Sequence, residues 1–226
     1  MGFLDKVADV KHRDSDDPQE LLDRGLMYYN AEEYSDAAEW FRKAAELGNA
    51  EAQNNMGYLY DNGMGVPELE GEAIGWYSKA AEQGHIPAMI NLALCYYSGK
   101  EEYRDYEKAY RWFKSAYDLG DTDAAFFLGQ CYAYGQGTEK DPEKALEILT
   151  VASDNAPEYT EFPEDLYQAP LLIAELYDSD DLGKDEDKAA EWYEVAADRG
   201  SDEAVDRHVE MGRREKKKGF LDRFRH

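Results

Sequence analysis

The sequence predicts an all-α fold, a right-handed α-solenoid of about five antiparallel helix hairpins followed by a C-terminal capping helix. The first observation behind this prediction is a recurring segment. Residues 37–48, 73–84 and 109–120 read AAEWFRKAAELG, AIGWYSKAAEQG and AYRWFKSAYDLG, at a fixed period of 36. Two further copies occupy 145–156 and 189–200. A fixed period of roughly 20 to 50 residues is typical of a repeat array.

Each copy carries its apolar residues at the spacing of one helix face. An alanine is followed by a large pair three and four residues later, and by a small residue at the seventh position. Positions i, i+3, i+4 and i+7 lie on one side of a helix. Four copies then end at glycine, a common residue just after a helix. The large pairs are Trp40-Phe41, Trp76-Tyr77, Trp112-Phe113, Ile148-Leu149 and Trp192-Tyr193.

A second pattern precedes these copies and predicts the first helix of each hairpin. Residues 52–63, 88–99 and 124–135 share A-x3-[LM]-[GA]-x2-Y-x2-G. The small residue allows the partner helix to approach closely, and the tyrosine fills the seam above it. The final glycine should close the helix in a left-handed conformation. The small residues of hairpins two to five are Gly57, Ala93, Gly129 and Ala174.

Together, the two patterns resemble the Sel-1-like repeat (SLR), a relative of the tetratricopeptide repeat. The resemblance covers about residues 18–202, and hairpins two and three match best. Hairpin one is nearer a plain tetratricopeptide repeat, because only 12 residues separate Gly25 from Ala37, against 16 between Gly57 and Ala73. Hairpin four lacks the pair of Trp and a second aromatic residue.

The repeat divides the chain into three expected parts. Residues 1–16 form an N-terminal amphipathic segment, 17–202 the helical repeat domain, and 203–226 a capping helix with a basic tail. An insertion at 154–168 precedes hairpin five, and we expect a surface loop there, with closure of the groove as the alternative.

The charge composition restricts the kinds of partner that the chain is expected to bind. The net charge is −25 and the mean hydropathy is −0.79. Residues 212–226 hold seven basic and two acidic residues, a net of +5, which leaves −30 for the rest. The repeat body should therefore repel nucleic acid and favour a neutral or basic partner. The tail permits weak contact with a membrane or a partner. Without an apolar run of transmembrane length or a signal peptide, we expect a cytoplasmic location.

Motifs that would carry chemistry are absent. Cys95 and Cys131 hold one repeat position and should be core residues. The acidic segment 178–187 departs from a calcium loop, with Leu182 and Ala189 where ligands are required. We therefore expect no metal, cofactor or catalytic residue, and no enzyme. A hydrolase is the remote alternative, because some cysteine-rich SLR proteins were linked to β-lactam binding or hydrolysis. Those proteins carry a cysteine pair in each repeat.

The resemblance implies a concave groove lined by the first helices, and a role as a non-enzymatic adaptor or scaffold for a protein or peptide. Exposed positions should lie three residues before the small residue and one and four after it. Leu22, Ile90 and Phe126 share these positions, but we expect them in the core. The groove candidates are Tyr29, Asn54, Tyr58, Leu94, Tyr97, Gln130 and Tyr134.

The two ends of the chain support an alternative function. GFLDKV at residues 2–7 resembles GFLDRF at 219–224. Both ends could then dock to one kind of surface, which would make this a self-assembling, membrane-docking or partner-docking protein.

Overall fold

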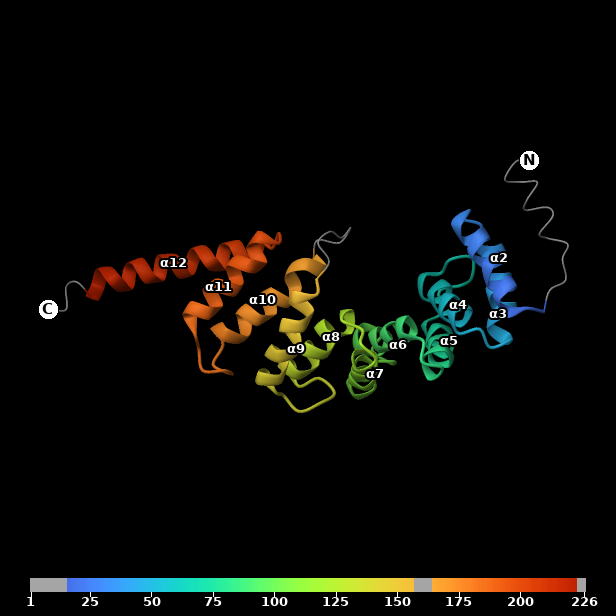
Figure 1. Cartoon of the computed structure of the whole chain (residues 1–226), viewed down its shortest axis with the longest axis horizontal. Helices are drawn as coiled ribbons and strands as arrows, with labels where there is room; N and C mark the ends of the chain where they lie inside the picture. The colour runs from blue at the N-terminus through green and yellow to red at the C-terminus, as the bar shows by residue number, and fades with distance from the viewer. Residues whose placement is uncertain (1–15, 157–163, 223–226) are drawn as a thin grey trace. The chain divides into compact units, whose positions relative to one another are not determined.

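The computed structural model describes residues 16–156 and 164–222, and this part of the chain contains eleven α-helices and no strand (Figure 1). The all-α solenoid prediction is confirmed: successive helices pair as antiparallel hairpins. The chain divides into two compact units, unit 1 over Met1–Ala116 and unit 2 over Tyr117–His226.

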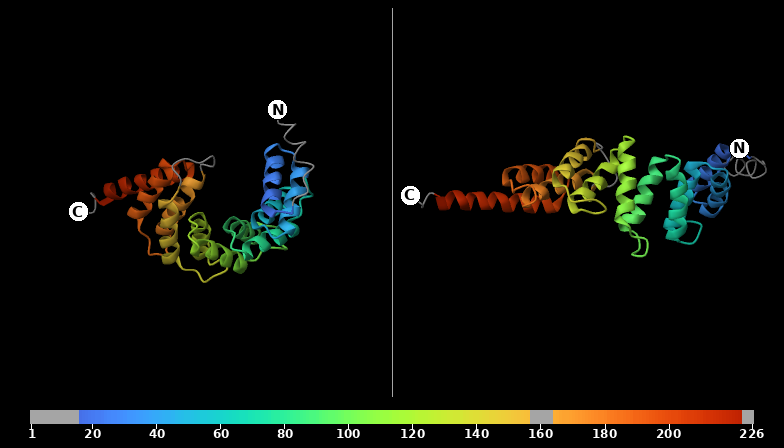
Figure 2. Two further views of the ribbon diagram at one scale, coloured as in Figure 1. Left: turned by 45° about the vertical axis from the view of Figure 1, so that its right-hand side comes forward. Right: turned by 90° about the horizontal axis from the view of Figure 1, so that it is seen from below.

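Unit 1 holds three hairpins. The final helix of the third hairpin ends two residues beyond the boundary, in unit 2. The helices of the three hairpins are α2 (Pro18–Asn30) and α3 (Tyr34–Glu46), α4 (Ala50–Asn62) and α5 (Glu70–Glu82), and α6 (Ile86–Ser98) and α7 (Tyr106–Asp118). Unit 2 holds α8 (Asp123–Tyr134) and α9 (Pro142–Asp154), α10 (Glu164–Asp178) and α11 (Glu186–Asp198), and the long C-terminal helix α12 (Asp202–Asp222) (Figure 2).

The recurring alanine and the second large residue of each copy form the core. Ala37, Ala73, Ala109, Ala145 and Ala189 have no exposed surface. Phe41, Tyr77, Phe113, Leu149 and Tyr193 are at most 2% exposed. The first large residue lies nearer the surface, where lysines one turn later cover two of the tryptophan rings. Lys43 Nζ is 4.3 Å from the Trp40 ring centre, and Lys79 Nζ is 3.9 Å from that of Trp76.

The small residue of each first helix allows the close approach that the sequence predicts. A Cβ atom added at Gly57 would lie 2.5 Å from the Tyr77 ring, and one at Gly129 would lie 2.6 Å from Leu149. Ala93 in hairpin three is fully buried at the same position. The two helices of a hairpin are therefore separated by little more than one aromatic or leucine side chain.

The predicted left-handed helix ends are correct at two of the three glycines. Gly63 and Gly135 have φ of +64° and +69°. Gly99 instead has φ −65° and ψ −176°, so the prediction is wrong there. A Cβ at Gly99 would lie 2.0 Å from Oε1 of Glu70. Glycine is required at this position to make room for that carboxylate, which accepts hydrogen bonds from the Lys100 backbone N–H at 3.0 and 3.2 Å.

Both cysteines are buried and unpaired, as expected for core residues. Burial raises the pKa of each thiol, Cys95 and Cys131, to about 12. A thiol with this pKa stays protonated and unreactive at neutral pH.

Among the helices that the structure describes, none combines the length and the apolar character needed to cross a membrane.

Candidate partner-binding face

Three of the polar and aromatic residues of α4 lie in one line along the helix. Asn54, Tyr58 and Asp61 are at i, i+4 and i+7, which places them on one face. The helix begins where the Asn49 side chain accepts the N–H of Ala52 at 2.8 Å, and it ends at Gly63. This arrangement puts an amide, a phenol ring and a carboxylate next to one another.

Tyr58 is the aromatic residue of this line, and 40% of its surface is exposed. Its ring meets that of Tyr29 on α2 edge-on, with centroids 6.4 Å apart. Tyr34 meets Tyr29 from the other side at 5.4 Å. Burial, followed by the neighbouring Tyr58, raises the pKa of Tyr29. We call Tyr29, Asn54, Tyr58 and Asp61 the Tyr58 face.

Asparagine side chains connect α4 to the next first helix. Nδ2 of Asn91 on α6 donates to Oδ1 of Asn54 at 3.1 Å. The α6 residue Leu94 follows Asn91 at i+3 and is half-buried. One hydrogen bond between two amide side chains thus links α4 and α6 beside Tyr58.

The surroundings of Asp61 are acidic. Partial burial raises the pKa of its carboxyl group, and the carboxylates of Glu70 and Glu68 raise it further, while Lys100 acts in the opposite direction. Among the charged neighbours, Glu70 and Glu68 each act on Asp61 more strongly than Lys100 does. A cation placed beside Asp61 would relieve that repulsion.

Tyr97 lies in a different setting from Tyr58. Its ring packs edge-on against Tyr106 at 5.5 Å and Phe113 at 6.0 Å, both on α7. Tyr97 is half-buried, and its ring lies against α7. Position within the repeat alone could not reveal these contacts, because they depend on the aromatic residues that α7 supplies.

The remaining candidates are on α8 in unit 2. Gln130 is half-buried, and Tyr134, one turn later, is 54% exposed. Partial burial raises the pKa of Tyr134, and the Glu175 carboxylate on α10 contributes. Glu175 has a raised pKa of its own, from partial burial and then from Glu203 on α12.

Sequence reasoning placed some residues correctly and missed others. Leu22 is 1% exposed, in line with the core expectation, whereas Ile90 and Phe126 are only half-buried. The sequence analysis did not single out Tyr34, whose ring contacts Tyr29, or Asn91, whose side chain donates a hydrogen bond to Asn54. Asn91 follows Ile90 directly, so a rule of fixed positions passes over it.

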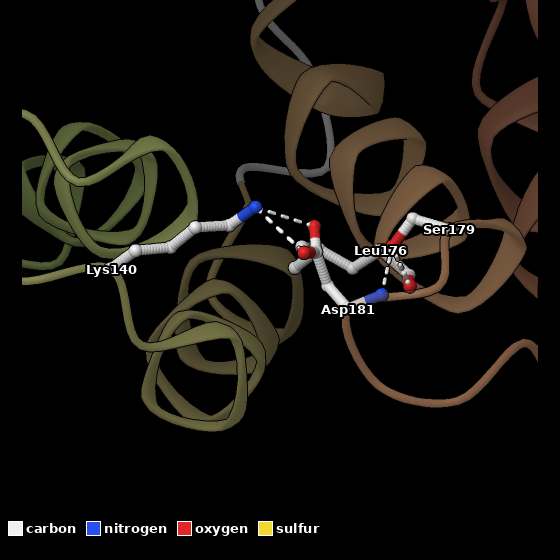
Figure 3. A network of polar contacts seen from close by, with 4 residues as sticks. All are labelled: Lys140, Leu176, Ser179 and Asp181. Carbon is white, nitrogen blue, oxygen red and sulfur yellow. Dashed lines mark hydrogen bonds and ion pairs between the residues drawn. The ribbon is translucent and has the colours of Figure 1, made fainter.

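Lysines pair with carboxylates of the acidic segment at the end of α10. Nζ of Lys184 lies 3.0 Å from Oδ1 of Asp178, and Nζ of Lys140 lies 2.7 Å from Oδ1 of Asp181 (Figure 3). The Ser179 hydroxyl donates to the Leu176 carbonyl at 2.8 Å and accepts the Asp181 N–H at 3.2 Å. Over residues 16–156 and 164–222, no group of three or more His, Cys, Asp or Glu is arranged to hold a metal ion.

Several predictions fall on residues whose structure is not described. The N-terminal segment with its GFLD sequence lies at 1–15, and 157–163 form the middle of the insertion. The second GFLD sequence is at the end of α12, beyond the last described side chain.

Successive helix hairpins, most of them built from helices of 12 or 13 residues with a small residue where the two helices cross, define a helical repeat protein of the tetratricopeptide type. The family model for the Sel1 repeat matches residues 22–49, 50–85, 86–121, 122–156 and 173–201. The chain therefore belongs to the Sel1 repeat family, which confirms the resemblance seen in the sequence.

Solved structures agree. The chain is 30% identical to a Sel1 repeat protein from Oxalobacter formigenes, with a TM-score of 0.69, covering 84% of this chain and 77% of that one. A protective antigen of uropathogenic Escherichia coli with an SLR fold gives 23% identity and a TM-score of 0.65, covering 88% of this chain. This chain spans 50% of that antigen. At under 25% identity, the likeness to the antigen shows the fold alone.

A third similar structure is the C-terminal part of a tetratricopeptide repeat-containing protein from Cytophaga hutchinsonii. It is 16% identical, with a TM-score of 0.58, and the match covers 87% of this chain and 72% of that one. No curated protein matches the chain. Sel1 repeat proteins are generally non-enzymatic scaffolds whose fold is typical of protein–protein interaction.

Proposed function

We propose that this chain is a non-enzymatic adaptor that binds a peptide segment of a partner protein, and that Tyr58 is the central contact. The observation that carries the proposal is the exposure of Tyr58 within an ordered aromatic pair. Its ring is 40% exposed and is supported from behind by Tyr29 at 6.4 Å. A rigid, exposed tyrosine loses little conformational entropy on binding, and tyrosine is enriched among residues that dominate interfaces.

The residues around Tyr58 favour a partner with a basic side chain. Asp61 lies one turn further along α4, and partial burial, followed by the nearby carboxylates of Glu70 and Glu68, raises its pKa. A Lys or Arg of the partner could stack on the Tyr58 ring and reach this carboxylate, combining cation–π and ionic attraction. The net charge of −25 adds long-range attraction for a basic segment.

Asn54 provides the polar contact that such a segment needs. Its amide oxygen accepts from Asn91, and an amide oxygen has the capacity to accept a second hydrogen bond, here from a partner's backbone N–H. We extend the binding surface along α6 to Leu94 in unit 1. Gln130 and Tyr134 on α8 are separate candidate contacts within unit 2. Tyr97 contributes by supporting α7, through its contacts with Tyr106 and Phe113.

The proposal includes a cytoplasmic location, where a basic or neutral peptide segment is the partner. Docking through the GFLD ends is the second candidate that the sequence raises, but no contact among the described residues favours it.

Site-specific photo-cross-linking tests the proposal. A photoreactive phenylalanine analogue replaces Tyr58 in the full chain, which is then irradiated in native lysate. The matched control carries the analogue at Leu47, which is 51% exposed and lies just after α3. We expect a protein cross-linked from position 58 and not from position 47, through a peptide rich in Lys or Arg. Equal cross-linking from both positions, or none from position 58, would refute the proposed site.

A further inference from the structure

Lysines and arginines cover a repeated tyrosine in four hairpins. In hairpins two to five, this tyrosine stands three residues after the small residue of the first helix. A cation over the face of an aromatic ring is attracted by the negative charge of that face. The chain thus pairs these rings with its own cations. The charged group and the ring centre are 5.9 Å apart for Arg42 and Tyr60, 5.0 Å for Lys108 and Tyr96, 4.4 Å for Lys144 and Tyr132, and 5.0 Å for Lys188 and Tyr177.

Tyr58 departs from this arrangement. It stands two residues before Tyr60, and 40% of its surface is exposed. Among the side chains that the structure describes, no lysine or arginine lies over its ring. The ring is held instead by Tyr29, with centroids 6.4 Å apart. The exposed surface of Tyr58 is therefore accessible to a cation from another molecule.

A group of carboxylates lies next to Tyr58. Asp61 follows it by one helical turn, and both Asp61 and Glu68 are exposed. Partial burial, then Glu70 and Glu68, raise the pKa of the Asp61 carboxyl group, and Lys100 acts more weakly in the opposite direction. A cation beside Asp61 would offset the repulsion among these carboxylates. The Tyr58 face is thus matched to a positively charged segment.

The chain itself contains such a segment, which we call the basic segment. Residues 213–218 read RREKKK, with five basic residues and one acidic residue, whereas residues 1–211 carry a net charge of −30. The segment belongs to α12, whose first half is anchored in unit 2 by Ala204 and Met211, packed in one core cluster with Tyr193. The second half of α12 extends away from α10 and α11 (Figures 1 and 2). A continuous helix therefore carries the basic segment outward, where a second molecule can reach it.

We propose that the Tyr58 face of one copy binds the basic segment of a second copy. This inference rests on the proposed function of that face and names one occupant for it, the chain itself. Arg214 and Lys218 are one helical turn apart, which is also the spacing of Asn54 and Tyr58 on α4. One cation of the segment stacks on the Tyr58 ring beside Asp61, and the next donates to the Asn54 amide oxygen.

The contact joins different surfaces of the two copies. Each copy carries both the Tyr58 face and the basic segment, so the association is head to tail and can repeat from copy to copy. A partner's basic peptide needs the same face, so the partner and a second copy exclude each other. Self-association therefore keeps the face covered until a partner competes for it.

Photo-cross-linking in purified protein tests the contact. The full chain with the photoreactive phenylalanine analogue at position 58 is mixed with a large excess of full chain that is labelled with heavy nitrogen and lacks the analogue. The mixture is irradiated without any other protein, and mass spectrometry identifies the linked peptide. We expect position 58 to link to residues 213–218 of the labelled chain. The matched control carries the analogue at Leu47, which is 51% exposed and should give no such link.

Charge variants of the full chain test the physical cause. Lys216→Glu/Lys217→Glu/Lys218→Glu in the labelled chain should abolish the link, because the segment then has more acidic than basic residues. Lys216→Arg/Lys217→Arg/Lys218→Arg keeps the charge and should keep the link. Salt at about 1 M shortens the Debye length to about 3 Å and should suppress the link as well.

Titration of a defined peptide tests the face. A peptide of residues 212–219 is titrated into the full-length charge-reversed variant, whose own segment no longer competes. Asp61→Asn in that variant should weaken binding roughly two- to fivefold. Asp61 is exposed, so circular dichroism should show an unchanged helix content.

Four results would overturn the proposal: no link from position 58 in purified protein, a link only within the unlabelled chain, a link to other residues of the labelled chain, or equal linking to the wild-type and charge-reversed chains. The outcome is separable from that of the proposed function. A partner cross-linked in lysate without a link in purified protein supports the proposed function and removes the self-contact. A self-link without any partner in lysate supports the self-contact and removes the partner.

Discussion

Adding one methyl group at Gly57 tests how closely the helices of a hairpin approach. The new Cβ would lie 2.5, 2.6 and 2.9 Å from three carbons of the Tyr77 ring, and contacts under 3.0 Å force something to move. Tyr77 is 1% exposed, so its ring cannot swing into solvent. Overpacking of this kind costs about 1–3 kcal/mol, and the upper half applies because three atoms clash at once.

Helix propensity opposes this effect, since replacing glycine by alanine within a helix gains about 1 kcal/mol. We therefore expect Gly57→Ala to lower the free energy of unfolding by roughly 1–2 kcal/mol in net terms.

The matched control is Gly75→Ala on α5, the helix that faces Gly57. A Cβ at Gly75 meets nothing within 4 Å, so only the propensity term remains. This variant should be more stable than the wild type by about 0.5–1 kcal/mol. Urea denaturation followed by far-UV circular dichroism gives both midpoints. If Gly57→Ala proves as stable as Gly75→Ala, the close approach of α4 and α5 is wrong.

Three further predictions concern unit 2 and the thiols. Partial burial raises the pKa of Glu175, so its ionisation opposes folding. Relative to Glu175→Gln, the wild type should therefore lose stability as the pH rises through that raised pKa. Parallel curves of unfolding free energy against pH for the two proteins would contradict this. Cys95 and Cys131, with pKa values of about 12, should resist a thiol reagent in the native protein and both react in denaturant, whereas rapid native labelling would show that they are accessible. The Lys140–Asp181 ion pair is 47% and 37% exposed, so a double-mutant cycle should give a coupling of only about 0.2–1 kcal/mol, and a value of several kcal/mol would mean that the pair is shielded from water.

The repeat could be read from the sequence because its core positions have a strict period. Each alanine of the second helices has no room for a larger side chain, and each aromatic partner must fill the space beside a small residue. Gly57 and Tyr77 illustrate this: the first is glycine because the second is a ring 2.5 Å away from any added Cβ. Constraints of this kind leave a mark in every repeat, so periodicity reveals them.

The contacts of surface residues could be predicted less well from the sequence than the core, because these contacts differ from one repeat to the next. Tyr58 and Tyr97 were expected to serve alike, yet their surroundings differ: Tyr97 packs edge-on against Tyr106 of α7, and Tyr58 against Tyr29 of α2. Gly99 shares its place with Gly63 but makes room for Glu70 instead of a left-handed turn. Each of these outcomes depends on one residue of a neighbouring helix, which a pattern within a single helix does not contain.

The exposure of Val205 and Val209 on α12 could be recognised only after the structure gave the register of that helix. In the sequence, the segment around Val205 and Val209 reads as a polar capping helix. Superposing its pattern on that of α4 requires the N-cap contact of Ser201 and the burial of Ala204. Exposure of the two valines then stands out against the buried residues of the other repeats.

The central claim is that a partner binds on Tyr58, and calorimetric titration of the cross-linked partner's peptide into the full chain tests it most directly. We predict that Tyr58→Ala raises the dissociation constant at least about tenfold, the equivalent of 1.4 kcal/mol, and that Leu47→Ala leaves it unchanged. Equal affinity of Tyr58→Ala and the wild type would contradict the account.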